Sequence, residues 1–158
     1  MRLTLLAVGG VKGPLAGAVE DYEARLGHYW RFEVVEVEAG AGRNRKAEGE
    51  AVAAAEEDRI LDRIPDGATV VALTRDGKAL GSRQLARFLE EKAVRSTQDV
   101  VFVIGGAFGL GKEILKRAAL KLSLSGMTFP HEIARLLLVE QLYRAGTILR
   151  NEPYHKGP

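Results

Sequence analysis

The 158-residue sequence contains no cysteine. This absence excludes a disulfide framework, a cysteine nucleophile and any zinc or iron–sulfur site built on thiolates. Long apolar runs are also missing, and none approaches the roughly 18 residues that a membrane-spanning helix requires. The apolar opening Leu3–Val8 ends at Gly9-Gly10 without a clear cleavage pattern, so we interpret it as a strand and not as a signal peptide. We therefore expect a cytoplasmic protein that does not span a membrane.

An excess of charge of one sign is also lacking. Lys and Arg number 23 against 21 Asp and Glu, which gives a formal net charge of +2. A charge this small does not indicate nucleic-acid binding, which would need a clustered basic patch. The composition, 46% hydrophobic and 28% charged, is ordinary for a folded protein and excludes a disordered tail or a collagen-like repeat. The length predicts one domain over residues 1–158 and excludes a two-domain enzyme.

Strand-like and helix-like segments alternate along the chain. Two strand-like runs, Thr69–Thr74 and Val100–Ile104, are almost continuously apolar, as strands buried on both faces are. The expected strands are Leu3–Val8, Phe32–Glu38, Thr69–Thr74, Val100–Ile104 and Leu122–Phe129. The expected helices are Leu15–Leu26, Ala47–Ile64, Ser82–Val94 with Ser82 as N-cap, Lys112–Ala119 and Glu132–Leu149, and Ala39–Lys46 is expected to form a loop. The alternation predicts a single α/β domain with a mostly parallel sheet flanked by helices.

A glycine-rich loop, Gly105–Lys112, follows one expected strand and precedes a helix. Its glycines do not have the dinucleotide-binding spacing. The phosphate-loop pattern fits from Gly106 to Lys112 but fails at Glu113, where a magnesium-binding hydroxyl belongs. Two interpretations from the residues stay open: a nucleotide-binding module with a degenerate phosphate loop, or a tight turn without a ligand.

A second unusual segment, Leu122–His131, contains Gly126 and leads through Pro130 into a helix. Its backbone could hold an adenine or a ribose, or the segment could be a buried last strand with a bulge at Gly126.

The ordered set of motifs resembles a known family. The loop Ile-Gly-Gly-x-x-Gly-Leu, the segment Leu-Ser-x-Met-Thr-Phe-Pro-His, the run Glu140–Ala145 and the ending Asn151–Lys156 occur in sequence. Together with the chain length and the N-terminal Leu-Leu-Ala-Val-Gly, they are similar to the ribosomal RNA large-subunit pseudouridine N3-methyltransferases of the SPOUT superfamily. The resemblance covers the whole chain.

This resemblance implies a C-terminal trefoil knot, a feature almost absent from proteins that no pattern rule would predict. It implies S-adenosyl-L-methionine as the cofactor, bound in the knot. The cofactor-binding residues would be Leu73, Gly105, Gly106, Leu124, Ser125, Gly126, Met127, Thr128 and Phe129. Two positions depart from the family pattern: Thr74 stands where Asp is frequent, and Ala107 where Pro or Ser is frequent.

The resemblance also implies a homodimer in which the partner's C-terminal tail completes each active site. The substrate would be a pseudouridine of the large-subunit RNA, methylated on the assembled ribosome. Methyl transfer to N3 requires alignment of the nitrogen with the methyl carbon, and removal of the N3 proton or stabilisation of the resulting anion. No metal is required.

Candidate catalytic residues lie near the C-terminus: Tyr154, His155, Arg144 and His131. His131 is a candidate base or a packed histidine at a helix start. Arg144 is a candidate ligand for a base carbonyl or simply the i,i+4 partner of Glu140. Tyr154 could stack on the target base, and His155 could take its proton or bind a carbonyl.

RNA contact is expected at Lys112, Lys116, Arg117 and Arg135, and Arg43, Arg45 and Lys46 form a second basic group. Either group could instead be ordinary solvated surface. A non-catalytic ribosome-binding factor with the same fold is a third functional interpretation beside the methyltransferase and the nucleotide-binding module.

Overall fold

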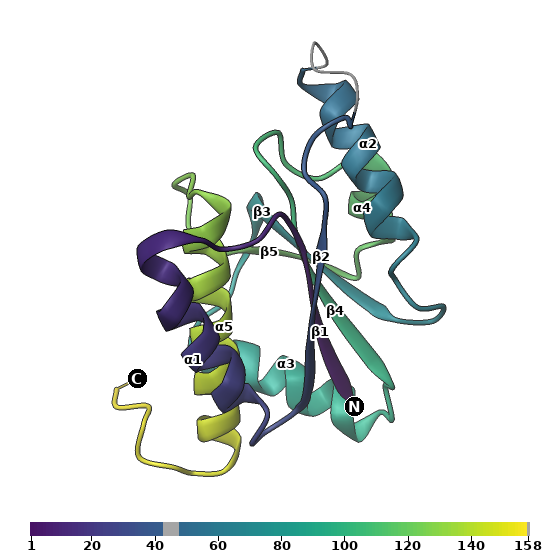
Figure 1. Ribbon diagram of the computed structural model, residues 1–158. Coiled ribbons are helices and arrows are strands. Elements are labelled where there is room, and N and C mark those ends of the chain that lie inside the picture. Colours follow the sequence, from purple (N-terminus) through teal and green to yellow (C-terminus); the bar gives the residue numbers. More distant parts are fainter. Residues whose placement is uncertain (43–47, 158) are drawn as a thin grey trace.

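A five-stranded parallel sheet forms the centre of the protein, with strand order β2-β1-β4-β3-β5 (Figure 1). The computed structural model describes residues 1–42 and 48–157. The strands are β1 (Arg2–Val8), β2 (Arg31–Val37), β3 (Thr69–Ala79), β4 (Asp99–Ile104) and β5 (Leu120–Ser123). The expected α/β architecture with a parallel sheet is confirmed.

Helices cover both faces of this sheet (Figure 1). The helices are η1 (Gly13–Leu15, a 3-10 turn), α1 (Ala16–Leu26), α2 (Glu50–Leu61), α3 (Ser82–Val94), α4 (Lys112–Arg117) and α5 (His131–Leu149). Helices α1, α3 and α5 pack on one face, and α2 and α4 lie on the other. Each connection between two consecutive parallel strands therefore contains a helix that packs on one face of the sheet.

The side-chain alternation along the central strands divides the core between the two faces. Leu3, Leu5 and Ala7 of β1 face the α1–α3–α5 layer, whereas Leu6 and Val8 face α2 and α4. Strand β4 alternates in the same way and is buried on both faces from Val100 to Ile104. This double burial explains why the strand is a continuous apolar run.

The last strand differs from its prediction. We expected Leu122–Phe129, but β5 runs from Leu120 to Ser123 and the chain then leaves the sheet. The Ser123 hydroxyl donates to the carbonyl oxygens of Arg75 (2.9 Å) and Ser125 (3.0 Å), and the Ser125 hydroxyl accepts the Met127 N–H. Because these serines bind nearby backbone groups, they favour a turn over continued strand pairing.

Two helix starts also differ from their predictions. Helix α3 is capped at Gly81, whose N–H donates to the Gln84 side chain (2.8 Å), while the expected cap Ser82 donates instead to Gln141 of α5 (2.6 Å). Helix α2 begins at Glu50; Ala47, the basic residues Arg43, Arg45 and Lys46, and the end of the expected Ala39–Lys46 loop lie outside the described residues.

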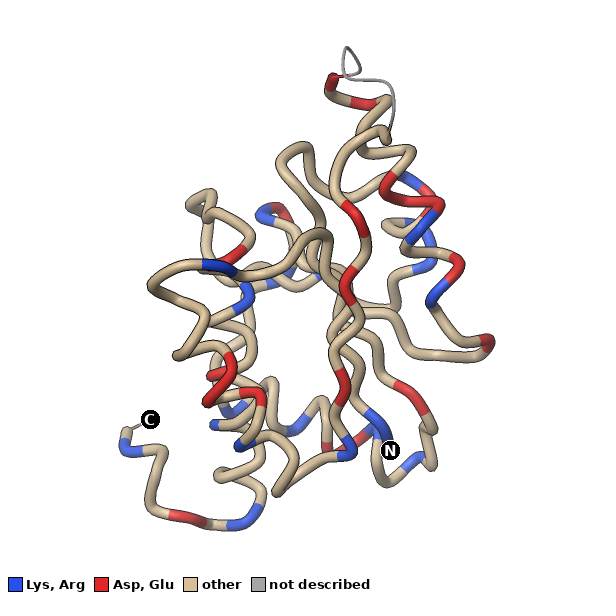
Figure 2. The backbone as a smooth tube through the Cα atoms, in the orientation of Figure 1, with Lys and Arg blue, Asp and Glu red and all other residues tan. Residues whose placement is uncertain are grey.

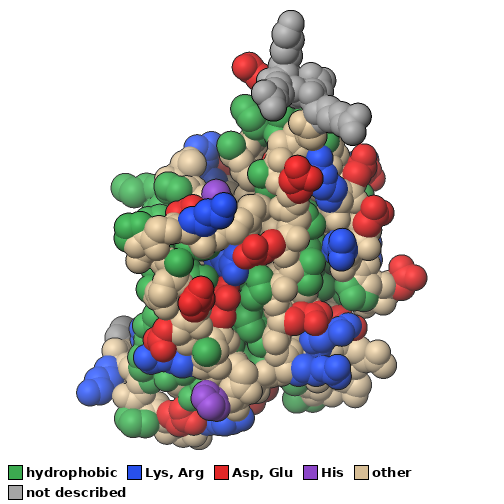
Figure 3. Space-filling view, in the orientation of Figure 1, with side chains coloured by type: hydrophobic (Ala, Val, Ile, Leu, Met, Phe, Trp, Pro, Cys, Tyr) green, Lys and Arg blue, Asp and Glu red, His purple; other side chains and the backbone are tan. Residues whose placement is uncertain are grey.

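Charge is distributed over the surface without a dominant sign. Acidic residues lie along β2, and acidic and basic residues are mixed on α2 (Figure 2). Blue and red side chains are interspersed on the face shown in Figure 3. Within the part of the chain that is described, no helix has both the length and the apolarity to cross a membrane.

Candidate functional site

A cavity of about 650 Å³ lies beyond the carboxyl ends of β3, β4 and β5. This is the end of a parallel sheet at which ligands bind, and the volume is that of a small-molecule site. The lining residues are Leu73, Thr74, Arg75, Asp76, Ile104, Gly105, Gly106, Ala107, Phe108, Gly109, Leu110, Leu115, Leu122, Leu124, Ser125, Met127, Thr128, Phe129, Pro130, His131 and Ala134.

The glycine loop after β4 forms one wall of this cavity. It folds back on itself, since the Gly109 N–H donates to the Gly106 carbonyl oxygen (3.1 Å). A Cβ atom at Gly105 would lie 2.7 Å from the Gly109 backbone, and Gly109 itself has φ of +78°. Glycine is therefore required at both positions for this tight turn.

The opposite wall is built where β3 and β5 meet. Leu122 is in register with both Leu73 and Lys78, so residues 74–77 bulge out of β3 toward the cavity. Gly77 permits the bulge, because a Cβ there would lie 2.6 Å from the Lys121 carbonyl oxygen. The Arg75 guanidinium then donates to the Thr128 hydroxyl (3.2 Å), which joins the bulge to the 124–130 segment.

The cavity brings together the predicted cofactor-binding residues Leu73, Gly105, Gly106, Leu124, Ser125, Met127, Thr128 and Phe129. Gly126 is exposed and does not line it. The walls combine leucine, isoleucine and phenylalanine side chains with accessible backbone. That lining fits S-adenosyl-L-methionine, a cofactor with an aromatic base, a ribose and an amino-acid end, better than it fits a triphosphate.

His131 is the single catalytic candidate that lines the cavity. It begins α5, and its Nε2 atom lies 3.4 Å from the Gly10 carbonyl oxygen at the end of β1. This contact joins the first turn of α5 to the loop after β1.

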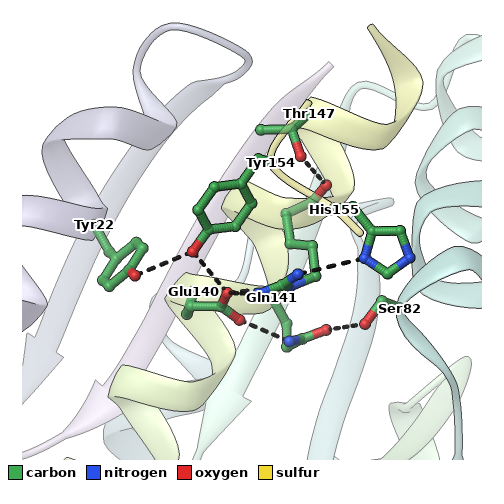
Figure 4. Close-up of polar contacts among 8 residues, drawn as sticks. Tyr22, Ser82, Glu140, Gln141, Thr147, Tyr154 and His155 are labelled. Atoms are coloured by element: carbon green, nitrogen blue, oxygen red, sulfur yellow. Dashed lines mark hydrogen bonds and ion pairs between the residues drawn. The ribbon is translucent and has the colours of Figure 1, made fainter. Parts of the chain in front are cut away.

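The other three catalytic candidates form a separate cluster, in which Tyr154 and His155 of the tail (Figure 4) lie against Arg144 in the C-terminal half of α5. Glu140 is the centre of this cluster. Its Oε1 atom accepts hydrogen bonds from Arg144 (Nη2, 2.6 Å; Nε, 3.1 Å) and from the Tyr154 hydroxyl (3.0 Å). Its Oε2 atom accepts from Gln141 (2.6 Å), which in turn contacts Ser82. Glu140 raises the pKa of Arg144, so the guanidinium stays charged.

The tautomer of the neutral His155 ring follows from its partner. Its Nδ1 atom lies 3.3 Å from Nη1 of Arg144, and a guanidinium can only donate. Nδ1 therefore accepts, and the ring carries its proton on Nε2. That Nε2 atom is buried and has no hydrogen-bond partner among residues 1–42 and 48–157.

All four tyrosines of the sequence gather around this cluster. The Tyr143 ring packs on Tyr22, Tyr29 and Tyr154, with centroid distances of 5.8, 5.5 and 4.8 Å. Burial and hydrogen bonds with Tyr22 and Glu140 raise the pKa of Tyr154 above its ordinary value. The Tyr154 hydroxyl therefore stays protonated near neutral pH and serves as a donor, not as a base.

The cavity and the cluster are far apart in one chain. His131 and Arg144 are thirteen positions apart on α5, which places them about 20 Å apart along the helix axis. An arginine side chain does not span that distance. The structure thus separates His131 from Arg144, Tyr154 and His155.

The predicted RNA-binding residues are also divided. Lys112, Lys116 and Arg117 are exposed on α4, although Lys116 pairs with Glu113 (2.7 Å). Arg135 has a side chain only 6% exposed. Its guanidinium binds Glu23 (2.8 Å) and Glu36 (2.6 Å), whose hydrogen bonds outweigh burial and raise its pKa. Arg135 thus ties α5 to α1 and β2, and the RNA contact expected at this residue stays a prediction.

The phosphate-loop interpretation meets a direct obstacle. The start of α4 is already occupied by a carboxylate of the protein, since Glu57 accepts the Ile114 N–H (2.9 Å). A carboxylate at this place repels a phosphate group. Among the described residues there is no group of three or more His, Asp or Glu side chains that could hold a metal ion.

Sequence reasoning missed several residues of the two groups. The sequence indicates Glu140 as the i,i+4 partner of Arg144 and as part of the Glu140–Ala145 motif, but not as the centre of a cluster. Tyr22 and Ser82 are more than fifty residues away in sequence and carried no signal. Arg75 and Phe108, which line the cavity, were also missed.

Comparisons with known proteins agree over the full chain. A family model described as a predicted SPOUT methyltransferase matches residues 1–155. A ribosomal RNA large subunit methyltransferase H from Gemmatimonas aurantiaca is 48% identical over 99% of this chain and 100% of its own length. The protein of the same name from Carboxydothermus hydrogenoformans is 43% identical, with the same coverage.

A solved structure supports the fold alone. The crystal structure of a probable methyltransferase from Bordetella pertussis Tohama I is 19% identical and has a TM-score of 0.55, covering 91% of this chain and 95% of that one. The sequence motifs, the family model and the near-complete coverage of relatives at 43–48% identity all agree. The chain belongs to the SPOUT methyltransferase family.

Proposed function

We propose that this protein transfers a methyl group from S-adenosyl-L-methionine to N3 of a pseudouridine in large-subunit ribosomal RNA, on the assembled ribosome. The observation that carries the proposal is the cavity, which gathers eight of the nine residues that the family resemblance assigns to the cofactor. The relatives named ribosomal RNA large subunit methyltransferase H support the substrate class. Because assembled ribosomes are cytoplasmic, we place the protein in the cytoplasm.

The chemistry assigned to each part follows from its polarity. The cofactor, when bound, supplies an electrophilic methyl group on a sulfonium. The cavity walls hold and orient it through apolar contacts and backbone groups, and exclude water from the reacting end. Arg144 is a charged donor suited to a carbonyl oxygen that flanks N3, where negative charge would develop as N3 loses its proton to solvent and takes up the methyl group.

We further propose that the active enzyme is a homodimer in which each cavity is completed by the tail of the other protomer. Two observations support this arrangement. The catalytic candidates of the tail lie about 20 Å along α5 from His131, too far to serve the cavity of their own chain. At the cavity rim, Phe108 and Met127 are 51% and 74% exposed, as side chains that meet another surface would be in isolation. The trefoil knot remains a prediction from the resemblance, and the single domain over residues 1–158 remains a prediction from the chain length.

A calorimetric titration tests the cofactor. S-adenosyl-L-methionine should bind saturably, and magnesium-ATP should not. Binding of ATP alone would overturn the proposal in favour of a nucleotide-binding module. Binding of neither ligand by the free protein, together with no methyl transfer to ribosomes, would favour a non-catalytic ribosome-binding factor.

A complementation experiment tests the shared site. Gly105→Val should disrupt the cavity, because a Cβ there meets the Gly109 backbone, and deletion of residues 154–158 removes the tail. Each variant alone should be inactive. Random pairing of the two gives half mixed dimers with one intact site each, so co-expression should restore about a quarter of the wild-type rate. No restoration, with mixed dimers present, would contradict a site shared between protomers.

A further inference from the structure

Two adjacent glutamates of α2 are buried behind the glycine loop. Glu56 is 3% exposed and Glu57 is 8% exposed, although glutamate is almost never this buried without a partner. They lie on the side of the loop opposite the cavity, since the loop lines the cavity and neither glutamate does. Burying two carboxylates directly behind the loop that lines the cavity is costly, which indicates that they have a role there.

Glu57 holds the end of the loop. Its Oε2 atom accepts the Ile114 N–H at 2.9 Å, in the first turn of α4. It also fills the space beside Gly111, where a Cβ atom would lie 2.2 Å from Oε2. A larger residue at 111 would push the Glu57 carboxylate out of this place, so the glutamate accounts for the loop's last glycine without a bound phosphate.

Glu56 lies beside the beginning of the loop, and its Oε2 atom is buried without a hydrogen-bond partner among the described residues. Its Oε1 atom accepts the Gly40 N–H at 2.8 Å, which fixes the carboxylate against the segment after β2. The same carboxylate lies against Gly106, where a Cβ atom would be 2.7 Å from Oε2. The two glutamates thus lie beside the loop at Gly106 and Gly111, and Glu57 also binds the first turn of α4 that follows it.

We infer that Glu56 and Glu57 are positioning residues that set the place of the glycine loop and thereby the affinity of the cavity for its cofactor. This inference rests on the proposed function for the identity of the ligand. Neither glutamate touches the cavity, so both act through the loop backbone. Truncation should therefore weaken cofactor binding without slowing the methyl-transfer step once the cofactor is bound.

The test compares Glu57→Ala with Glu57→Gln and with Asp58→Ala. Glutamine keeps an oxygen that can accept the Ile114 N–H, and Asp58 is an exposed neighbour on the same helix. Calorimetry should show a dissociation constant for S-adenosyl-L-methionine raised about tenfold in Glu57→Ala, because a buried N–H loses its acceptor. Glu57→Gln and Asp58→Ala should stay within about threefold. KM for the cofactor should rise with the dissociation constant, and kcat should change less than about twofold.

Gly111→Ala displaces the Glu57 carboxylate without truncating it, so this variant keeps the test decisive if Glu57→Ala is poorly folded. Gly111→Ala places a methyl group on Glu57, so it should weaken cofactor binding strongly in the wild type and much less in a Glu57→Ala background. Amide exchange of residues 105–115, measured without cofactor, should be faster in Glu57→Ala and in the corresponding Glu56→Ala variant. This exchange readout does not depend on the ligand's identity.

The outcomes separate two failures. Unchanged cofactor affinity and unchanged loop exchange in both alanine variants, with only a lower melting temperature, would overturn the inference and leave a purely structural role. A fall in kcat at unchanged KM would also overturn it. Failure of the unaltered protein to bind the cofactor would overturn the proposed function instead, while loop exchange would still show whether the glutamates position the loop.

Discussion

The Tyr154 hydroxyl lies 3.0 Å from Oε1 of Glu140 and donates a hydrogen bond to it, and this contact fixes the C-terminal tail on α5. The Arg144 guanidinium strengthens the attachment, because it binds the same carboxylate and lies 4.7 Å from the Tyr154 ring centroid. A polar tail would otherwise be mobile. These contacts hold Tyr154 and His155 of the tail beside Arg144 of α5.

Deletion of residues 154–158 should separate binding from catalysis. The cavity contains none of these residues, so the dissociation constant for S-adenosyl-L-methionine should stay within about twofold of wild type. The rate of methyl transfer to ribosomes should fall at least about a hundredfold, the usual cost of losing oriented donors. Calorimetry and a radiolabelled methyl-transfer assay measure the two quantities, with Tyr154→Phe as a milder control. Full-rate transfer by the truncated protein would show that the tail has no catalytic role.

Alkaline pH should reveal the hydrogen bond between Tyr29 and Glu152. This bond and partial burial raise the pKa of Tyr29 to about 12, above its ordinary value near 10. A raised pKa means that the folded protein keeps a proton which the unfolded chain releases. The stabilisation is thus complete below pH 10 and is lost as the pH rises through 12.

Urea unfolding at pH 8 to 11.5 checks this prediction. The free energy of unfolding should fall more steeply with pH in the wild type than in Tyr29→Phe, which cannot titrate there. Parallel pH dependences in the two proteins would show that the hydrogen bond does not shift the titration of Tyr29.

Gly146→Ala should destabilise the protein although alanine is the better helix former. A Cβ at Gly146 would lie 2.5 Å from Cγ of Tyr29, in the buried contact between α5 and the tyrosines. Overpacking of this kind costs about 1–3 kcal/mol, more than the helix propensity gained. Gly17→Ala in α1 is the matched control, because nothing lies within 4 Å of its added methyl group. Chemical denaturation should show opposite signs for the two substitutions, and a stabilised Gly146→Ala would contradict the packing described.

Arg135→Met should lower stability and leave RNA binding unchanged. The substitution removes the partner of Glu23 and Glu36, and the lost charge-assisted hydrogen bonds are worth about 2–3 kcal/mol in the free energy of unfolding. Exposed Arg87→Met on α3 should cost less than about 0.5 kcal/mol. Equal midpoints of urea unfolding for the two variants would refute the structural role of Arg135.

The exposed basic residues of α4 should act on ribosome affinity. Replacing Lys112, Lys116 and Arg117 by Gln removes up to three phosphate contacts, so KM for ribosomes should rise. The slope of log KM against the logarithm of salt concentration should decrease by roughly two to three. Cofactor affinity should not change. Lys92 and Arg95, at the end of α3, provide a control pair. An unaltered salt slope in the triple variant would show that α4 does not meet RNA.

The predictable part of the fold is the part with strong local patterns. The apolar runs at Val100–Ile104 and Thr69–Thr74 exist because both faces of these strands are covered. Their alternation with helical segments is what predicts the parallel sheet. The end of β5 could not be predicted, because it depends on Ser123 finding the Arg75 carbonyl oxygen, a partner 48 residues away. Gly81 displaced Ser82 as helix cap for a similar reason, since Ser82 contacts Gln141 across the structure.

The candidate site could also be predicted only in part from the sequence. The segments that line the cavity could be located from motif order, because the glycine loop and the Leu122–His131 segment each stand at a strand end. The roles of individual charged groups could not. Arg135 looks like a surface cation in the sequence, and only the packing of α5 on α1 and β2 brings two carboxylates to it. Glycines 106 and 111 look like a ligand loop, yet both also leave room for the glutamate carboxylates behind them.

The central claim is tested most directly by mass spectrometry of the nucleosides of large-subunit RNA. Ribosomes that lack the modification would be incubated with the purified protein and S-adenosyl-L-methionine, beside naked RNA and the variant lacking residues 154–158. We predict one N3-methylated pseudouridine per ribosome with the intact protein, little on naked RNA and almost none with the truncated variant. A methyl group on any other nucleoside, or no methylated pseudouridine despite bound cofactor, would contradict the account.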